Sequence, residues 1–180
     1  FVEGYLGCQE EARTHGDRCI QGGPEESAHF RKQDKALRAA IRQDPDGIAL
    51  SVTNGSFLRN NALRHHSSSN TPLVTFDSDF TPANQHLREA YIGPDNERIG
   101  ARLGQLLAET GVVPGRLCFM SSDRGDTNLR QRVVGAREYL TENTAWQEAP
   151  RCPLYNNDSI DSALKQLQYI LENRAASAIV

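Results

Sequence analysis

The chain has 180 residues, of which 38% are hydrophobic and 24% are charged, and its formal net charge is −3. This length suits one medium domain or two small ones with a real hydrophobic core. The slightly acidic balance argues against a nucleic-acid-binding surface, which needs clustered Lys and Arg, and no apolar run is long enough to span a membrane.

The first half of the chain alternates helical periodicity with short apolar runs. Apolar residues between Phe1 and Ala12 recur at helical spacing, which predicts a helix that ends near Gly16. After it we expect a strand at 18–23, a helix at 27–43, a strand at 47–52, a helix at 57–66 and a strand at 72–76. The run GIALSV (47–52) is almost continuously apolar, which indicates a strand covered on both faces.

The second half continues the same alternation. We expect a strand at 89–93, a helix capped by Asp95 or Asn96, a strand at 116–120, a helix at 128–140, an extended stretch at 145–154, a helix at 160–171 and a strand at 177–180. Strands that alternate with helices in this way predict an α/β fold with parallel sheets and helices on both faces.

The alternation is interrupted once, by a longer irregular connection at 79–94. We therefore predict two lobes, an N-terminal one over residues 1–94 and a C-terminal one over residues 95–180. A helix without a preceding strand opens the chain and a bare strand closes it, so we expect a fragment of a larger two-lobed protein.

The cysteines are Cys8, Cys19, Cys118 and Cys152, and their spacing fits no zinc or redox motif. Four cysteines allow three pairings, which the sequence does not rank. Four buried thiols are the alternative to disulfides, and bridges would indicate an oxidising compartment.

Polar residues that follow the predicted strands are the candidates for a binding site, because the carboxyl ends of parallel strands gather loops and helix N-termini. They are Gln21, Ser51, Thr53, Asn54, Asp77, Ser78, Asp79, Ser121 to Asp126, and Asn156 to Asp158. Because a carboxylate can accept hydrogen bonds from adjacent hydroxyls, we expect Asp77 to hold a polyhydroxylated ligand. The alternative is that Asp77 and Asp79 only form a turn or cap a helix.

The sequence gives little support for an enzyme. The chain has no G-x-S-x-G, P-loop, G-x-G-x-x-G or H-E-x-x-H motif, and its five histidines fall away from the strand ends. Asp77 and Asp79 are too loosely paired for acid and base roles to be assigned. We expect no enzyme activity, no cofactor and no metal.

Five segments together resemble the type I periplasmic sugar-binding proteins, most closely their ribose-binding branch. They are DGIALSV (46–52), TPLVTFDSD (71–79), AYIGPDNERIGARLGQLL (90–107), GDTNLRQRVVGAREYL (125–140) and LYNNDSIDSALKQLQYIL (154–171). The same fold forms the effector-binding domain of lac-repressor-type regulators. The resemblance implies two Rossmann-like lobes, joined by a multi-strand hinge, that close on a ligand.

The resemblance also implies site residues. Asp77 matches the aspartate that usually holds the sugar, whereas Ser78 stands where an arginine is common. Ser51 falls near the site position after the preceding strand, and Arg130 matches an arginine of the second lobe that contacts sugar. We add Asn128, from the same GDTN segment, to this ligand-binding set. Arg132 matches a position that braces its helix.

We therefore expect a solute-binding protein that captures a sugar or similar polyol in the periplasm. Its partner would be the membrane permease of an ABC importer, or it would be the sensory domain of a membrane receptor, and no nucleic acid would bind through this segment. The alternative is the effector-binding domain of a lac-repressor-type transcription regulator.

Overall fold

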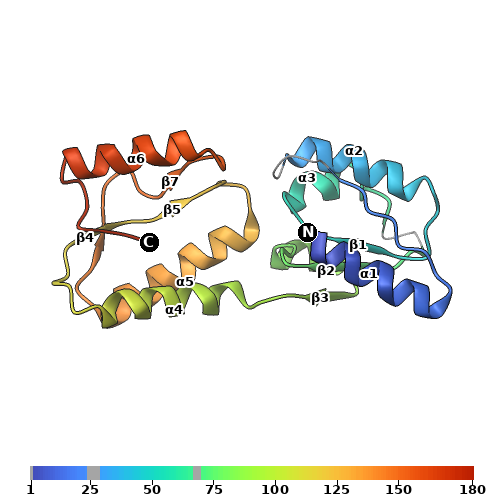
Figure 1. The fold of residues 1–180 in the computed structure, drawn as a ribbon, viewed down its shortest axis with the longest axis horizontal. Helices are drawn as coiled ribbons and strands as arrows, with labels where there is room; N and C mark the ends of the chain where they lie inside the picture. The colour runs from blue at the N-terminus through green and yellow to red at the C-terminus, as the bar shows by residue number, and fades with distance from the viewer. Residues whose placement is uncertain (1, 24–28, 67–69) are drawn as a thin grey trace.

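The computed structural model describes residues 2–23, 29–66 and 70–180 and has two lobes, which share no sheet (Figure 1). The N-terminal lobe contains α1 (Val2–His15), α2 (Phe30–Ile41), β1 (Ile48–Leu50), α3 (Gly55–Asn60), β2 (Leu73–Phe76), the 3-10 helix η2 (Pro82–Leu87) and β3 (Ala90–Ile92). The C-terminal lobe contains α4 (Asn96–Glu109), β4 (Arg116–Cys118), β5 (Met120–Ser121), α5 (Thr127–Asn143), β6 (Gln147–Glu148), β7 (Leu154–Tyr155), α6 (Ile160–Glu172) and β8 (Ala178–Ile179).

All strand pairs in the described residues are parallel. The first sheet has the order β1-β2-β3, with Thr75 paired to Leu50 on one side and to Tyr91 on the other. The second lobe has a sheet of order β6-β4-β8 and a two-stranded sheet of β5 and β7. The predicted α/β class with parallel sheets is therefore confirmed.

Each lobe has its own hydrophobic core. In the N-terminal lobe the core gathers around Leu58, Leu63 and Phe80, and in the C-terminal lobe around Leu117, Phe119 and Leu140. No buried cluster of the described residues joins the two cores, so the lobes are packed as separate units. The segment between β3 and α4 connects them (Figure 1), and the domain boundary predicted between residues 94 and 95 stays a prediction.

Small residues allow α4 and α5 to approach closely along one face of the C-terminal lobe. A Cβ at Gly100 would overlap the backbone carbonyl of Arg132, and one at Gly135 would overlap the carbonyl of Glu97. The backbones of the two helices are therefore in direct contact, and α5 is held in a fixed position relative to the start of α4.

Most expected elements are present within a few residues, and the exceptions have physical causes. The segment 18–23 is not a strand: Ile20 is 59% exposed, and no described strand pairs with this segment. The helix expected at 57–66 starts at Gly55 and ends at Asn60, because the backbone of Asn61 leaves the helical region and its side-chain amide donates to the Phe57 carbonyl. The residues at which two helices were predicted to start, Phe1 and Ser27, lie outside the described residues.

The four cysteines form two disulfides, Cys8–Cys19 and Cys118–Cys152. The first joins α1, which has no buried residue, to the unpaired segment that follows it. The second joins the end of β4 to the segment before β7. None of the helices in the described residues combines the length and the apolar character required for a membrane span.

Candidate functional site

The candidate site in the N-terminal lobe begins with a tight turn at Asp77, directly after β2. The amide of Ser78 donates to the carbonyl of Phe76 at 2.6 Å, and Asp77 between them has a φ of 58°. This is a γ-turn of the rarer, positive-φ kind, and Asp is one of the few residues besides Gly and Asn that adopt a positive φ with some frequency. The turn is held by its neighbours, because the Asp77 amide donates to Ile92 of β3.

The turn brings the Asp77 carboxylate next to the end of β1. The Ser51 hydroxyl donates to Asp77 Oδ2 at 3.3 Å, and both side chains are half-buried. Two of the predicted site residues are thus in contact at the carboxyl ends of neighbouring strands.

Gln33 of α2 fixes the loop after β1. Its side-chain amide donates to the Ser51 carbonyl at 2.6 Å, and its Oε1 accepts a hydrogen bond from the Thr53 hydroxyl, also at 2.6 Å. Thr53 is therefore engaged within the lobe. Asn54 caps α3, since its Oδ1 accepts from the amide of Phe57 at 3.0 Å.

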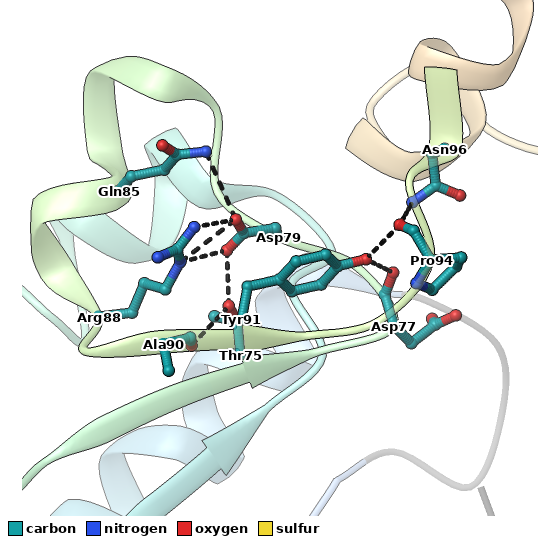
Figure 2. A network of polar contacts seen from close by, with 9 residues as sticks. All are labelled: Thr75, Asp77, Asp79, Gln85, Arg88, Ala90, Tyr91, Pro94 and Asn96. Carbon is teal, nitrogen blue, oxygen red and sulfur yellow. Dashed lines mark hydrogen bonds and ion pairs between the residues drawn. The ribbon is translucent and has the colours of Figure 1, made fainter. Parts of the chain in front are cut away.

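Asp79 has a structural role instead of a place in the site. It is 7% exposed, and its carboxylate forms an ion pair with Arg88 at 2.6 Å and accepts from the Thr75 hydroxyl at 2.6 Å (Figure 2). Burial by itself would raise the pKa of Asp79, but the hydrogen bonds from Arg88 and Thr75 outweigh it and lower the pKa below its usual value.

The C-terminal lobe contributes a group of carboxylates. Burial raises the pKa of Asp126, at the start of α5, from 3.8 to about 6. The negative charges that add to this effect belong to Asp123, Asp158 and Asp77. Beside them the Arg124 guanidinium lies 4.9 Å from the centre of the Tyr155 ring, at the end of β7.

The two groups face each other across the junction of the lobes. A Cβ at Gly125 would lie 3.7 Å from the side-chain nitrogen of Asn54, so the loop before α5 lies against the start of α3. The charge of Asp77 acts on Asp126 from the opposite lobe. We call the residues Ser51, Asn54, Asp77, Asp123 and Asp126 the inter-lobe group. They offer hydrogen-bond acceptors and donors from both lobes to whatever lies between them.

The remaining predicted site residues lie in different surroundings. Ser78 is 4% exposed, and its hydroxyl has no partner among the described residues. The Asn128 side chain accepts from the amide of Leu129 within the first turn of α5, and Arg130 is exposed on the same helix. Gln21 is exposed in the unpaired segment 16–23. Arg132 donates to the side chain of Asn96 at 2.8 Å, in line with the bracing position expected for it.

Sequence reasoning missed the two tyrosines near the site, Tyr91 and Tyr155. Both lie in short strands, where a tyrosine is an ordinary residue, so their residue type carries no functional signal. The only hint is their position, since each stands at or near the carboxyl end of its strand.

Metal binding has no support in the part of the chain that the structure describes, where no three His, Cys, Asp or Glu side chains are grouped to hold an ion. A surface depression of about 370 Å³ between β7 and α6 is lined by Leu154, Lys165 and Tyr169 among others, and by no residue of the inter-lobe group. The arrangement of strand ends therefore points to the junction of the lobes.

Comparison with known proteins agrees with this architecture. The sequence model of a family described as "Periplasmic binding protein domain" matches residues 2–180. No curated protein sequence matches significantly. Among solved structures, the chain is similar to an ABC transporter solute-binding protein from Agrobacterium vitis with bound D-fucose, at 20% identity and a TM-score of 0.81, covering 97% of this chain and 61% of that one.

A glucose-galactose binding protein from Geobacillus stearothermophilus is 20% identical with a TM-score of 0.84, covering 97% of this chain and 60% of that one. A solute-binding protein from Burkholderia graminis in complex with D-arabinose is 18% identical with a TM-score of 0.76, at 97% and 60% coverage. At these identities the likeness shows the fold. The chain spans about 60% of the length of the solved structures that it matches.

Proposed function

Because the chain belongs to the periplasmic binding protein domain family, we propose that it is a solute-binding module that captures a sugar or similar polyol between two hinged lobes. It delivers the ligand to the permease of an ABC importer or acts as the sensory domain of a membrane receptor. It performs no chemistry on the ligand. It acts by closing on the ligand, because a ligand that contacts both lobes stabilises the closed conformation.

The observation that carries the proposal is the approach of the two lobes where the loop before α5 lies against the start of α3, with the carboxylates of Asp77 and Asp126 on opposite sides. A carboxylate accepts hydrogen bonds from one or two hydroxyls, and a polyol presents several in a row. Asp77 and Ser51 form the contact of the N-terminal lobe. Asn128 and Arg130 supply contacts from α5. Ser78, whose backbone amide closes the Asp77 turn, completes the proposed ligand-binding set.

Two further observations support an extracytoplasmic place. The solved structures that resemble the chain include several ABC solute-binding proteins. The two disulfides are consistent with an oxidising compartment, which argues against the alternative of a cytoplasmic regulator's effector domain. We place the protein in the periplasm.

A thermal-shift screen of the full-length protein tests the proposal, with D-fucose, D-arabinose, D-glucose, D-galactose and D-ribose as the panel. A ligand that binds only the folded state stabilises it by about 2.7 kcal/mol at 100 times its Kd, which raises the melting temperature by several degrees. Asp77→Ala is expected to abolish the shift, and Asp46→Ala, in an exposed turn, is expected to keep it. No shift with any sugar, or an unchanged shift in Asp77→Ala, would contradict the proposal.

A further inference from the structure

The hydroxyl of Tyr91 lies between the Asp77 turn and the segment that joins the lobes (Figure 2). It is 2.8 Å from the carbonyl oxygen of Asp77 and 3.0 Å from that of Pro94. Gly93 makes this position accessible, because a Cβ there would overlap the Tyr91 hydroxyl. The Tyr91 hydroxyl therefore links the Asp77 turn directly to residues 93–95, the segment between β3 and α4 that joins the lobes, which we call the crossover.

A phenolic hydroxyl has one proton, whereas a backbone carbonyl can only accept. Tyr91 can thus donate fully to one of the two carbonyls at a time. Burial raises the pKa of Tyr91, with the charges of Asp77 and Asp79 adding to the effect, so the hydroxyl keeps its proton under physiological conditions. The two carbonyls compete for a single donor.

The carbonyl of Pro94 has a second donor. The side-chain amide of Asn96 lies 3.4 Å from it, and the Oδ1 of the same side chain accepts from Arg132 of α5 at 2.8 Å. Asn96 is 4% exposed, so its amide is held by these protein groups. A chain of hydrogen-bonding groups therefore runs from the Asp77 turn through Tyr91, the crossover and Asn96 to the C-terminal lobe.

The Asp77 turn gives this contact its importance. Asp is one of the few non-Gly residues that adopt a positive φ, and at Asp77 the φ of 58° belongs to a tight turn that hydrogen bonds from neighbouring groups hold in place. The Tyr91 hydroxyl is one of the groups that hold it. A displacement of Pro94 relative to β3 would change which carbonyl receives the proton, and with it the support of the turn.

We propose that Tyr91 is a positioning residue that orients the Asp77 carboxylate and couples its occupation by a ligand to the crossover between the lobes. The proposal rests on the proposed function in that Asp77 is taken as a ligand contact. The coupling itself is a property of the unliganded chain.

Hydrogen–deuterium exchange on the full-length protein tests the coupling without any ligand. Tyr91→Phe removes only the hydroxyl oxygen, and we expect amide exchange to become at least tenfold faster in both 76–79 and 92–97, while 116–121 in the other sheet stays unchanged. Gly93→Ala, which displaces the phenol, is expected to give the same pattern. Tyr169→Phe, 47% exposed on α6, is the matched control and should change neither segment.

The same exchange experiment with a bound sugar distinguishes a role of Tyr91 in positioning Asp77 for the ligand from a purely structural role. The probe is the sugar of the panel above that gives the largest shift with the unaltered protein. In the unaltered protein, this sugar is expected to slow amide exchange in both 76–79 and 92–97. In Tyr91→Phe it is expected to slow exchange only in 76–79 and to bind with an affinity about tenfold lower. Unchanged exchange in Tyr91→Phe, faster exchange in only one segment, faster exchange throughout β2 and β3, or sugar protection of both segments in the variant would each overturn the inference. If no sugar binds the unaltered protein, the proposed function fails, while the exchange comparison still decides the coupling.

Discussion

The carboxylates of Asp77 and Asp126 come from different lobes, and their negative charges interact. Burial contributes most to the raised pKa of Asp126, and Asp123 and Asp158 contribute next. Burial and these neighbouring charges raise the cost of ionising Asp126, so the junction of the lobes holds the ionised form of this carboxylate at a cost. A hydroxyl-rich ligand would donate hydrogen bonds to these groups and lower that cost.

Asp126→Asn is expected to stabilise the protein at neutral pH. A pKa raised from 3.8 to about 6 means that the folded state binds the proton more tightly than the unfolded state. The stability that comes from this proton is complete below about pH 3.8 and is lost as the pH rises through about 6. The full shift corresponds to about 3 kcal/mol, and solvent screening at this half-buried site reduces the expected difference to about 1 kcal/mol at pH 7.

Urea unfolding from pH 4 to pH 7.5 measures this difference. The free energy of unfolding of Asp126→Asn should exceed that of the unaltered protein by an amount that grows across that range. For Asp46→Asn, in an exposed turn, the difference from the unaltered protein should stay constant. A constant difference between Asp126→Asn and the unaltered protein would show that Asp126 ionises normally.

The ion pair between Asp79 and Arg88 should be important for the stability of the N-terminal lobe. The two side chains are 10% and 19% exposed, and removing one partner leaves the other charge largely buried. Asp79→Ala is expected to lower the free energy of unfolding by about 3 kcal/mol. Because the pKa of Asp79 is lowered, this contribution is present above its usual value of 3.8 and is lost as the pH falls below it.

The exposed pair of Arg102 and Glu109 is the control. Glu109→Ala should cost less than about 1 kcal/mol, because exposed ion pairs are screened by water. Equal losses in Asp79→Ala and Glu109→Ala, measured by chemical unfolding, would show that burial gives the Asp79 pair no special weight.

The order of strands and helices could be predicted because it depends on periodicity, which each segment carries in its own residues. The cap at Asp95 is an example. An Asp directly before a helical pattern predicts an N-cap, and the Asp95 side chain accepts a hydrogen bond from the Arg98 backbone amide. The segment 18–23 could not be predicted in this way, because an apolar run becomes a strand only where a neighbour pairs with its backbone. Asp79 shows the same limit, since its partner Arg88 lies in a region read only as an irregular connection.

The residues of the candidate site could likewise be predicted only where the signal lies in their own segment of the sequence. Ser51 and Asp77 were found because each follows its own strand, and the parallel register brings them together. Tyr91 was missed because its importance depends on the carbonyls of Asp77 and Pro94, and backbone groups have no signature in the sequence. The pairing of the cysteines was likewise set by the fold and not by their spacing.

The contact between α4 and α5 should not accept even one methyl group. Gly100→Ala would place a Cβ against the Arg132 carbonyl, and a shift of the two helices is expected to cost about 2–3 kcal/mol. Gly4→Ala makes the same change in α1, where nothing lies within 4 Å, and should instead stabilise by up to about 1 kcal/mol. Thermal unfolding of the two variants compares them directly, and a neutral Gly100→Ala would contradict the close contact.

The two disulfides should differ in their resistance to reduction. Cys118 is 0% exposed, whereas Cys8 is exposed on α1, so mild dithiothreitol under native conditions should open Cys8–Cys19 first. The Cys118–Cys152 bridge closes a longer segment, with a separation of 34 residues. Replacing both of its cysteines with Ala is expected to cost about 3–4 kcal/mol, because the bridge restricts the unfolded chain.

Thiol labelling of protein taken from its native compartment, followed by mass spectrometry, checks both the order of reduction and the place of the protein in the cell. Exported protein should arrive without reactive thiols, and labelling after graded reduction should modify Cys8 and Cys19 before Cys118 and Cys152. A regulator of the cytoplasm would keep its thiols reduced. Four reactive thiols in freshly isolated protein would therefore contradict the periplasmic assignment and favour the effector-binding alternative.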